Sequence, residues 1–376
     1  MCGVHNILGN TEGIGRVSGL QQLYRCGGNL RAGVKRTTAL LVLLVAMARA
    51  GFVVNVQRGP LLSGDGIVFM HHAVPLRKTD ISSRFGRNHG KGMRAKIAIQ
   101  EQSHEFIHSI PSVNCAPGGA RVQHWPIGVE RYRVTGLPES IDALILTSDL
   151  QGADRHDVSV LHRRLVGHVV AEHLEMLCHT ETLPPAERCG VLLAGDLFAH
   201  ISLDKRGGLG DVIPVWKDFA SRFRWVTGVA GNHDTFGGDT RSMASLHACD
   251  GCYGLDGGVV HLDSLCIGGV SGVVGSSGKP WKRAPKHFES MLHDVLDHGP
   301  DILVLHHSPQ LIQGEELTGS ELVADVLSHH ATPLSFSVSG HVHWPSSLHI
   351  KEGKHQALPL FNVDHRVVVL QREDLL

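Results

Sequence analysis

The sequence of 376 residues lacks several features that would assign it to a large class of proteins at once. Its most apolar run, residues 38–47, is far shorter than the roughly 20 residues that span a bilayer. It contains no Walker A phosphate loop, no dinucleotide-binding glycine motif and no GxSxG nucleophile elbow. We therefore expect neither a membrane protein nor a P-loop nucleotidase, a Rossmann-type enzyme or a serine hydrolase.

Cysteines are few and widely spaced, eight in all, which fits reduced thiols better than a disulfide framework. Cys249 and Cys252 form a CxxC without a second pair, so we interpret it as a loop coincidence rather than a zinc or redox site. The chain does not start with the basic region of a secretory signal. We therefore expect a cytoplasmic protein.

The small net charge of −1 hides a division of the chain. Residues 1–140 contain 17 lysines and arginines against 7 acidic residues, a net charge of +10, and the rest carries −11. Residues 77–96 alone hold seven basic residues and one acidic residue, so they either neutralise phosphates of a nucleic acid or form a solvated linker. The basic half thus has either an anionic partner or the acidic half as its partner.

The order of elements at the N-terminus loosely resembles a winged helix-turn-helix. The sequence predicts helices near residues 19–24 and 34–50, and then a hairpin formed by residues 51–59 and 66–70. The second helix is polar only at its start, whereas the recognition helix of that family presents polar residues to the major groove. Nucleic-acid binding and a packing or dimerising role are both left open.

Residues 97–128 read as loop because of their prolines and glycines. We place a domain boundary just after them, near residues 136–138. The expected organisation is a basic N-terminal domain at residues 1–136 and a larger α/β domain at residues 137–376.

From Ile141 onward apolar strands alternate with helices, which predicts a layered α/β domain. The predicted strands are residues 143–147, 190–194, 225–229, 259–262, 264–269, 301–305, 335–339 and 367–370. The predicted helices are residues 158–177 and 212–223, with a further helix only after Pro285.

Polar side chains follow five of these strands at the point where each strand ends. They are Asp149 and Gln151, then Asp196, then Asn232, His233 and Asp234, then His306 and His307, and finally His341 and His343. The carboxyl ends of strands in an open α/β sheet are the usual place for a site. Carboxylate, amide and imidazole groups are ligands of hard or borderline divalent metals.

The order D-x-Q, GD, GNHD, H, GHxH resembles the calcineurin-like metallophosphoesterase superfamily over about residues 141–376. Three stretches resemble one bacterial branch of this superfamily, and this resemblance does not identify a substrate. They are the glycine-rich runs at residues 204–208 and 267–278, and residues 340–345. The resemblance implies a four-layer α/β/β/α sandwich that holds two divalent ions, Mn²⁺, Fe²⁺/Fe³⁺ or Zn²⁺.

The resemblance also implies roles for the ligands. Asp196 would bridge both metals; Asp149, Gln151 and His343 would belong to one metal, and Asn232, His306 and His341 to the other. Most members have histidine at the position of Gln151, and glutamine can offer only an amide oxygen or a hydrogen bond to bound water. His307 would line the site or pack beside it.

In the mechanism that we expect, the metals lower the pKa of a bound water, which attacks phosphorus in line. His233 is in position to protonate the leaving oxygen or to stabilise charge on the phosphoryl group, with Asp234 orienting its ring. Lys205 and Arg206 either contact the substrate phosphate or are solvated.

Two functions follow from the sequence. The first is a phosphohydrolase acting on phosphodiesters or phosphomonoesters, with nucleic acid or nucleotides among its candidate substrates. The second is a nucleic-acid-binding or scaffold protein whose phosphoesterase domain has lost activity. Gln151 slightly favours the second, whereas the other six ligands and His233 favour the first.

Overall fold

The computed structural model divides into two compact units, Met1–Gly92 and Met93–Leu376. It describes residues 52–58, 68–75 and 96–373, apart from the short gaps 117–120, 156, 205–206, 240, 277–279, 314–315, 332 and 355–356. In the first unit β1 (Phe52–Arg58) pairs antiparallel with β2 (Val68–Pro75), as the sequence predicts. The two helices expected before this hairpin lie outside the described residues, so the winged helix stays a prediction.

Two large sheets form the second unit. The first sheet has the order β12 (Cys252–Gly254), β10 (Trp225–Gly228), β8 (Cys189–Leu193), β7 (Ala143–Ser148), β23 (Arg366–Arg372), β6 (Ile127–Thr135) and β3 (Ala98–Ile110). The second has the order β13 (Gly258–Leu262), β14 (Leu265–Val270), β17 (Ile302–His307), β20 (Phe336–Gly340), β22 (Ala357–Asn362) and β21 (Leu348–Glu352).

Shorter elements connect the strands of the two sheets. Two-stranded sheets join β4 (Val113–Cys115) to β5 (Val122–His124), β9 (Gly210–Asp211) to β11 (Asp234–Thr235), β15 (Val273–Val274) to β16 (Lys282–Arg283), and β18 (Leu311–Gln313) to β19 (Glu316–Thr318). Single 3₁₀ turns are η2 (Val160–His162), η3 (Ala186–Arg188) and η4 (Ala244–Ala248).

The side chains of each strand alternate between two hydrophobic cores, and this alternation creates the layers. In β7, Ile145 packs with α3 (Val166–His179) and α4 (Ile213–Arg222) on the outer side of the first sheet. Its neighbours Leu144 and Leu146 pack into the core between the two sheets. The helices α5 (Pro285–Asp297) and α6 (Glu321–His329) cover the outer face of the second sheet.

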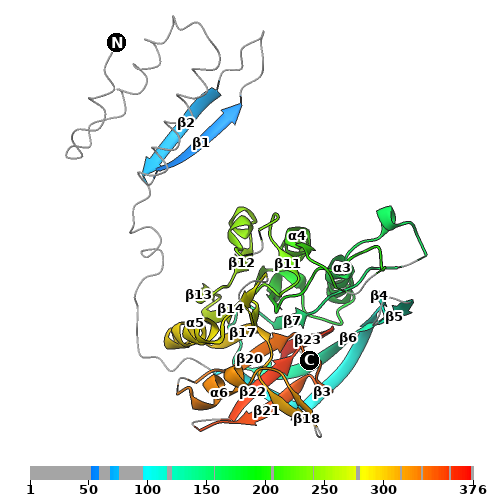
Figure 1. The fold of residues 1–376 in the computed structure, drawn as a ribbon, viewed down its shortest axis with the longest axis vertical. Coiled ribbons are helices and arrows are strands. Elements are labelled where there is room, and N and C mark those ends of the chain that lie inside the picture. The colour runs from blue at the N-terminus through cyan, green and yellow to red at the C-terminus, as the bar shows by residue number, and fades with distance from the viewer. Residues whose placement is uncertain are drawn as a thin grey trace, which may run out of the picture. The chain divides into compact units, whose positions relative to one another are not determined.

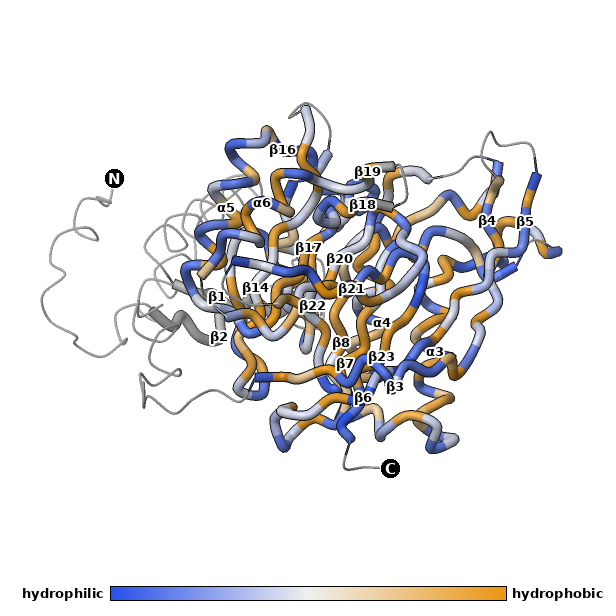
Figure 2. The backbone as a smooth tube through the Cα atoms, turned by 90° about the horizontal axis from the view of Figure 1, so that it is seen from below, coloured by the Kyte–Doolittle hydropathy of each residue, from blue (hydrophilic) through white to orange (hydrophobic). Residues whose placement is uncertain are grey.

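These contacts confirm the four-layer α/β/β/α sandwich that the sequence analysis expects (Figure 1). In Figure 2 the hydrophobic colour gathers along the inner strands, where β7, β8, β17 and β20 are buried over most or all of their length. Such wholly apolar strands are typical of sheets covered on both faces.

Helix boundaries follow local chemistry. Proline occupies the first turn of α5, where its missing N–H has no helical partner to lose. Ser320 caps α6 by accepting a hydrogen bond from the amide of Val323. The helix predicted from residue 158 begins only at Val166, because Leu165 has extended backbone angles and η2 precedes it.

The prediction of a loop over residues 97–128 is wrong, and the structure places the division between the units earlier than residue 136. Both β3 and β6 belong to the first sheet, where β6 pairs parallel with β23 and antiparallel with β3. β3 is an edge strand whose side chains are largely exposed, so it lacks the apolar alternation that marks a strand in a sequence. The prolines and glycines that indicated a loop lie between the strands.

None of the helices in the described part of the chain combines the length and the apolar character that crossing a membrane requires.

Candidate metal centre

The candidate site lies where the carboxyl ends of strands from both sheets meet. In the first sheet β7, β8 and β10 run parallel, and in the second β14, β17 and β20 do so. Asp149 directly follows β7, Asp196 follows β8 by two residues, and Asn232 lies in the turn after β10. The second sheet contributes His306 from the end of β17 and His341 directly after β20.

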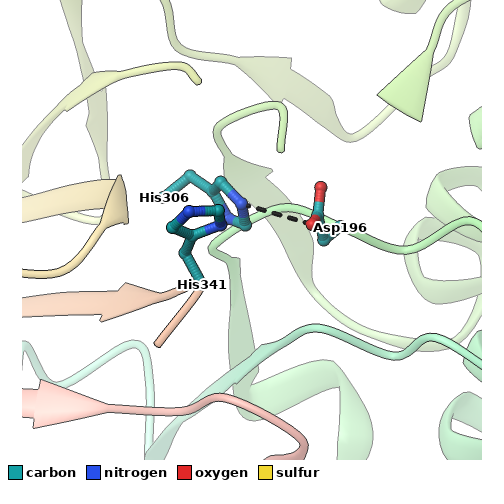
Figure 3. A group of neighbouring side chains, drawn as sticks. All are labelled: Asp196, His306 and His341. Carbon is teal, nitrogen blue, oxygen red and sulfur yellow. Dashed lines mark ion pairs between the residues drawn. The ribbon is translucent and has the colours of Figure 1, made fainter. Parts of the chain in front are cut away.

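Three of the expected ligands converge at the centre (Figure 3). The potential ligand atoms of Asp196, His306 and His341 all lie within 4.8 Å of one another. Nε2 of His306 is 3.4 Å from Oδ2 of Asp196, and the ring centroids of His306 and His341 are 5.0 Å apart. This arrangement brings together a carboxylate from one sheet and two imidazoles from the other.

Among the described residues, two buried atoms at the centre form no hydrogen bond: Oδ1 of Asn232, and Nε2 of His306, which lies in an ion pair with Oδ2 of Asp196 at 3.4 Å. A buried polar atom without a partner costs about 1–3 kcal/mol, so native proteins rarely keep one without a function. Nδ1 of His306 donates to the carbonyl of Ala194, which holds the ring with Nε2 toward Asp196. These donors fit a divalent cation.

The carboxylates of the centre repel one another when no cation separates them. Burial raises the pKa of Asp149 well above its usual range, and the charges of Asp364 and Asp196 add to this effect. Burial alone would raise the pKa of Asp196 too, but His306 and His233 lower it to about 2. The ionised carboxylate of Asp196 is thus available as a ligand at neutral pH.

His306 responds to the same charges. Burial alone would lower its pKa, but Asp196 and Asp149 raise it to about 10. In the metal-free protein this imidazole therefore holds a proton that a bound cation replaces.

The backbone is strained at three of the ligand residues. Asp149, Asp196 and His341 have φ values of 53°, 55° and 69°, a region that costs non-glycine residues on the order of 1–3 kcal/mol each. Gly231 is needed for close approach, because a Cβ at this position would lie 2.0 Å from Oδ1 of Asp196. The strand-to-turn sequences thus bring backbone and carboxylate into direct contact.

Gln151 contacts the expected bridging ligand: its Nε2 donates a 2.9 Å hydrogen bond to Oδ2 of Asp196. His343 lies farther out, and its side chain is 63% exposed. Its Nδ1 is 3.0 Å from Oδ2 of Asp364. Both residues line a cavity of about 300 Å³ together with Trp125, Asp149, Asp196, His233, His341 and Asp364.

His233 reaches this cavity from the turn after β10. Its Nδ1 donates to the carbonyl of Gly208, which leaves Nε2 on the side of Asp196, 3.9 Å from Oδ2. The backbone amide of His233 donates to Oδ1 of Asp196, 2.8 Å away. The ring is therefore held in one tautomer with a free nitrogen beside the metal ligands.

The expected role of Asp234 in orienting His233 differs from what the structure shows. The carboxylate of Asp234 is fully buried and accepts hydrogen bonds from the backbone amides of Asp196, Leu197 and Gly231, at 2.8–2.9 Å. Asp234 thus fixes the two ligand-bearing turns relative to each other, and Gly208 orients the histidine ring. Burial and the nearby Asp196 raise the pKa of Asp234 to about 6.

His307 packs beside the centre. Its Nδ1 accepts a hydrogen bond from the amide of Val274, and its ring meets that of His341 edge to face at 5.2 Å. Burial and the charge of His306 lower its pKa to about 4. Lys205 and Arg206 lie outside the described residues.

The sequence analysis missed three residues that line or adjoin the centre, Trp125, Asp364 and Lys282. Trp125 stacks on His365 with ring centroids 3.9 Å apart, and Lys282 lies on the short strand β16. Asp364 lies two residues before β23, which the sequence predicts, so a search beside that strand could have found it. Trp125 and Lys282 belong to no sequence motif that would indicate a site.

We expect the metal-free protein to lose stability as the pH rises from about 6.5 to 10. The folded-state pKa values of Asp234 and His306 are raised to about 6 and about 10, so their protonated forms stabilise the fold. That contribution is complete below the unfolded pKa of each group, about 4 for Asp and 6.5 for His, and is lost as the pH rises through the folded value. Asp196, His307 and His341 act oppositely, because their folded-state pKa values are lowered to about 2, 4 and 3, but their contributions are complete above about pH 6.5.

Bound metal needs deprotonated ligands, so the gap in melting temperature between metal-loaded and chelator-treated protein should widen from about pH 5 to 9. Differential scanning fluorimetry at several pH values measures it. If the difference in melting temperature narrowed over this pH range, the buried groups would not have the pKa values given above.

Comparison with known proteins places this geometry in a family. A model described as calcineurin-like phosphoesterase matches residues 144–345, more than half of the chain, and this stretch runs from β7 to just past His343. No curated protein matches the chain. The crystal structure of AQ665 from Aquifex aeolicus, a protein of unknown function, matches with 14% sequence identity and a TM-score of 0.27, over 60% of this chain and 95% of that chain. The chain belongs to the calcineurin-like phosphoesterase family.

Proposed function

We propose that the protein is a hydrolase that uses two divalent metal ions to cleave phosphomonoesters or phosphodiesters. The observation that carries this proposal is the convergence of Asp196, His306 and His341, whose potential ligand atoms lie within 4.8 Å of one another. Beside them, Oδ1 of Asn232 is buried without a hydrogen-bond partner among the described residues. A carboxylate, an amide oxygen and two imidazoles together form a ligand set for a divalent cation, and a cation would satisfy the amide oxygen of Asn232.

The ligand assignment follows the family motifs and the contacts of the centre. Asp196 would be shared by the two ions, since its Oδ2 lies next to both Gln151, assigned to one ion, and His306, assigned to the other. Asp149, His343 and Gln151 would hold one ion. Asn232, His306 and His341 would hold the other.

Two such ions, when bound, supply Lewis acidity that lowers the pKa of a water and neutralises phosphoryl charge. Side chains of the protein supply the proton and hold the ligands in position. Nε2 of His233 stands free at the cavity wall, because Nδ1 is engaged by Gly208. When protonated, Nε2 can donate its proton to the oxygen that leaves phosphorus. Asp234 keeps the turns that carry Asp196 and His233 in register through its three amide contacts.

The proposal is tested with metal-stripped full-length protein and two substrates, bis-p-nitrophenyl phosphate and p-nitrophenyl phosphate. Separate addition of Mn²⁺, Fe²⁺, Ni²⁺ and Zn²⁺ should restore turnover with at least one metal, and metal analysis should give two ions per chain. The ratio of the two rates distinguishes diester from monoester preference. Protein that is folded and binds metal but turns over neither substrate would instead support the binding or scaffold function.

A further inference from the structure

A second and larger cavity lies beside the metal centre, and His233 forms part of the wall of both. Its volume is about 670 Å³, against about 300 Å³ for the metal cavity. Cavities of roughly 300–1,000 Å³ accept whole organic ligands. The residues that line it are His200, Gly208, Leu209, Asn232, His233, Pro280 and Lys282.

The two cavities differ in charge. The metal cavity is lined by three carboxylates, Asp149, Asp196 and Asp364, and by no lysine or arginine among the described residues. The second cavity has the reverse character: its described lining includes Lys282 and two histidines but no carboxylate. A low-dielectric cleft lined by one sign of charge attracts ligands of the opposite sign. The second cavity is therefore suited to an organic anion.

Lys282 is held at the junction between this cavity and the histidine cluster. Its strand β16 pairs with β15, and Val274 of β15 donates its amide to Nδ1 of His307. Among its described lining residues, the cavity offers Lys282 no carboxylate. The next residue, Arg283, forms a bidentate pair with Asp256 at 2.8 Å and is thus already engaged. Of the two neighbouring cations, Lys282 is the one available to a ligand.

We propose that the second cavity is the leaving-group subsite, and that it selects phosphoesters whose leaving group is itself an organic anion, with Lys282 as the specificity-determining residue. This inference rests on the proposed function. His233 would donate its proton to the leaving oxygen, so the departing group lies beside His233, whose ring borders the second cavity as well as the metal cavity. The apolar Leu209 and Pro280 pack against the body of the leaving group, and Lys282 pairs with its charge.

The test compares three substrates that differ only in the leaving group: phenyl phosphate, 3-carboxyphenyl phosphate and 3-phosphonophenyl phosphate. The metal-loaded wild type should show kcat/KM at least about tenfold higher for the two anionic substrates, and the carboxylate and phosphonate arms tell which anion is preferred. Lys282→Met should remove this preference, lowering kcat/KM for the two anionic substrates about tenfold more than for phenyl phosphate. Lys282→Arg should retain it, and Lys217→Met on the exposed face of α4 is the matched control. Equal kcat/KM for all three substrates, or a preference that survives Lys282→Met, would overturn the proposal.

A binding measurement separates failure of this subsite from failure of the proposed function. Calorimetry with 3-hydroxyphenylphosphonate, the leaving group alone, should show binding to the wild type and about tenfold weaker binding to Lys282→Met. Binding of this kind without hydrolysis of any substrate would uphold the subsite and reject the hydrolase. Hydrolysis without any binding of the leaving group, or with binding unaffected by Lys282→Met, would reject the subsite.

Discussion

Replacing Asp196 by asparagine should lower kcat/KM for phosphoester hydrolysis by about a thousandfold or more, because metal-ion stabilisation of transition-state charge is worth several kcal/mol. The carboxylate is 2% exposed and lies against His306, Gln151 and the amide of His233. A neutral amide of the same shape keeps the packing but cannot offset the repulsion of two cations. Steady-state kinetics and metal content per chain measure the effect.

The matched control is Asp250→Asn, which makes the same chemical change at an exposed position before β12. The metal-free Asp196→Asn protein should remain folded by circular dichroism, since the substitution removes a buried charge rather than a hydrophobic contact. Retention of activity within tenfold, with two ions still bound, would show that Asp196 does not bridge the metals.

Replacing His233 by alanine should lower kcat by about 10²–10⁴-fold for an ester with a poor alkyl leaving group, and by much less for a nitrophenyl ester. The reason is that a good leaving group departs without a proton, whereas an alkoxide needs the one that Nε2 supplies. The metal content should not change, because His233 contacts Asp196 chiefly through its backbone amide. Parallel assays of methyl phosphate and p-nitrophenyl phosphate measure the difference.

His247→Ala, at an exposed position of η4, serves as the control for His233→Ala. An equal loss on both substrates would assign His233 to stabilising phosphoryl charge instead of protonating the leaving group. No loss on either would remove it from the chemistry.

The layered fold and the convergence of the site could be predicted because both depend on short-range patterns. An apolar strand followed at once by Asp149, Gly195–Asp196 or His306 indicates which edge of the sheet those side chains reach. In the structure Asp196 and His306 lie at that edge together with His341. The edge strand β3 could not be found, because it has neither a buried face nor an apolar alternation.

The role of Asp234 and the position of Lys282 could not be predicted from the sequence either. The hydrogen-bond partners of Asp234 are backbone amides, two of them 37 and 38 residues away in the chain. Because every residue except proline has a backbone amide, the sequence does not indicate which amides a side chain contacts. Lys282 lies on a strand of two residues, and its neighbours in space come from other segments of the chain. Contacts of this kind depend on the tertiary packing of turns.

The left-handed backbone of Asp149, Asp196 and His341 has a consequence for engineering. Glycine would adopt these angles without strain, so the backbone conformation alone would favour glycine at all three positions. The three ligand side chains therefore keep a backbone strain that glycine would relieve. A directed-evolution experiment that selects only for thermal stability should therefore replace these metal ligands early. It should yield a more stable protein that no longer has the activity of the metal centre.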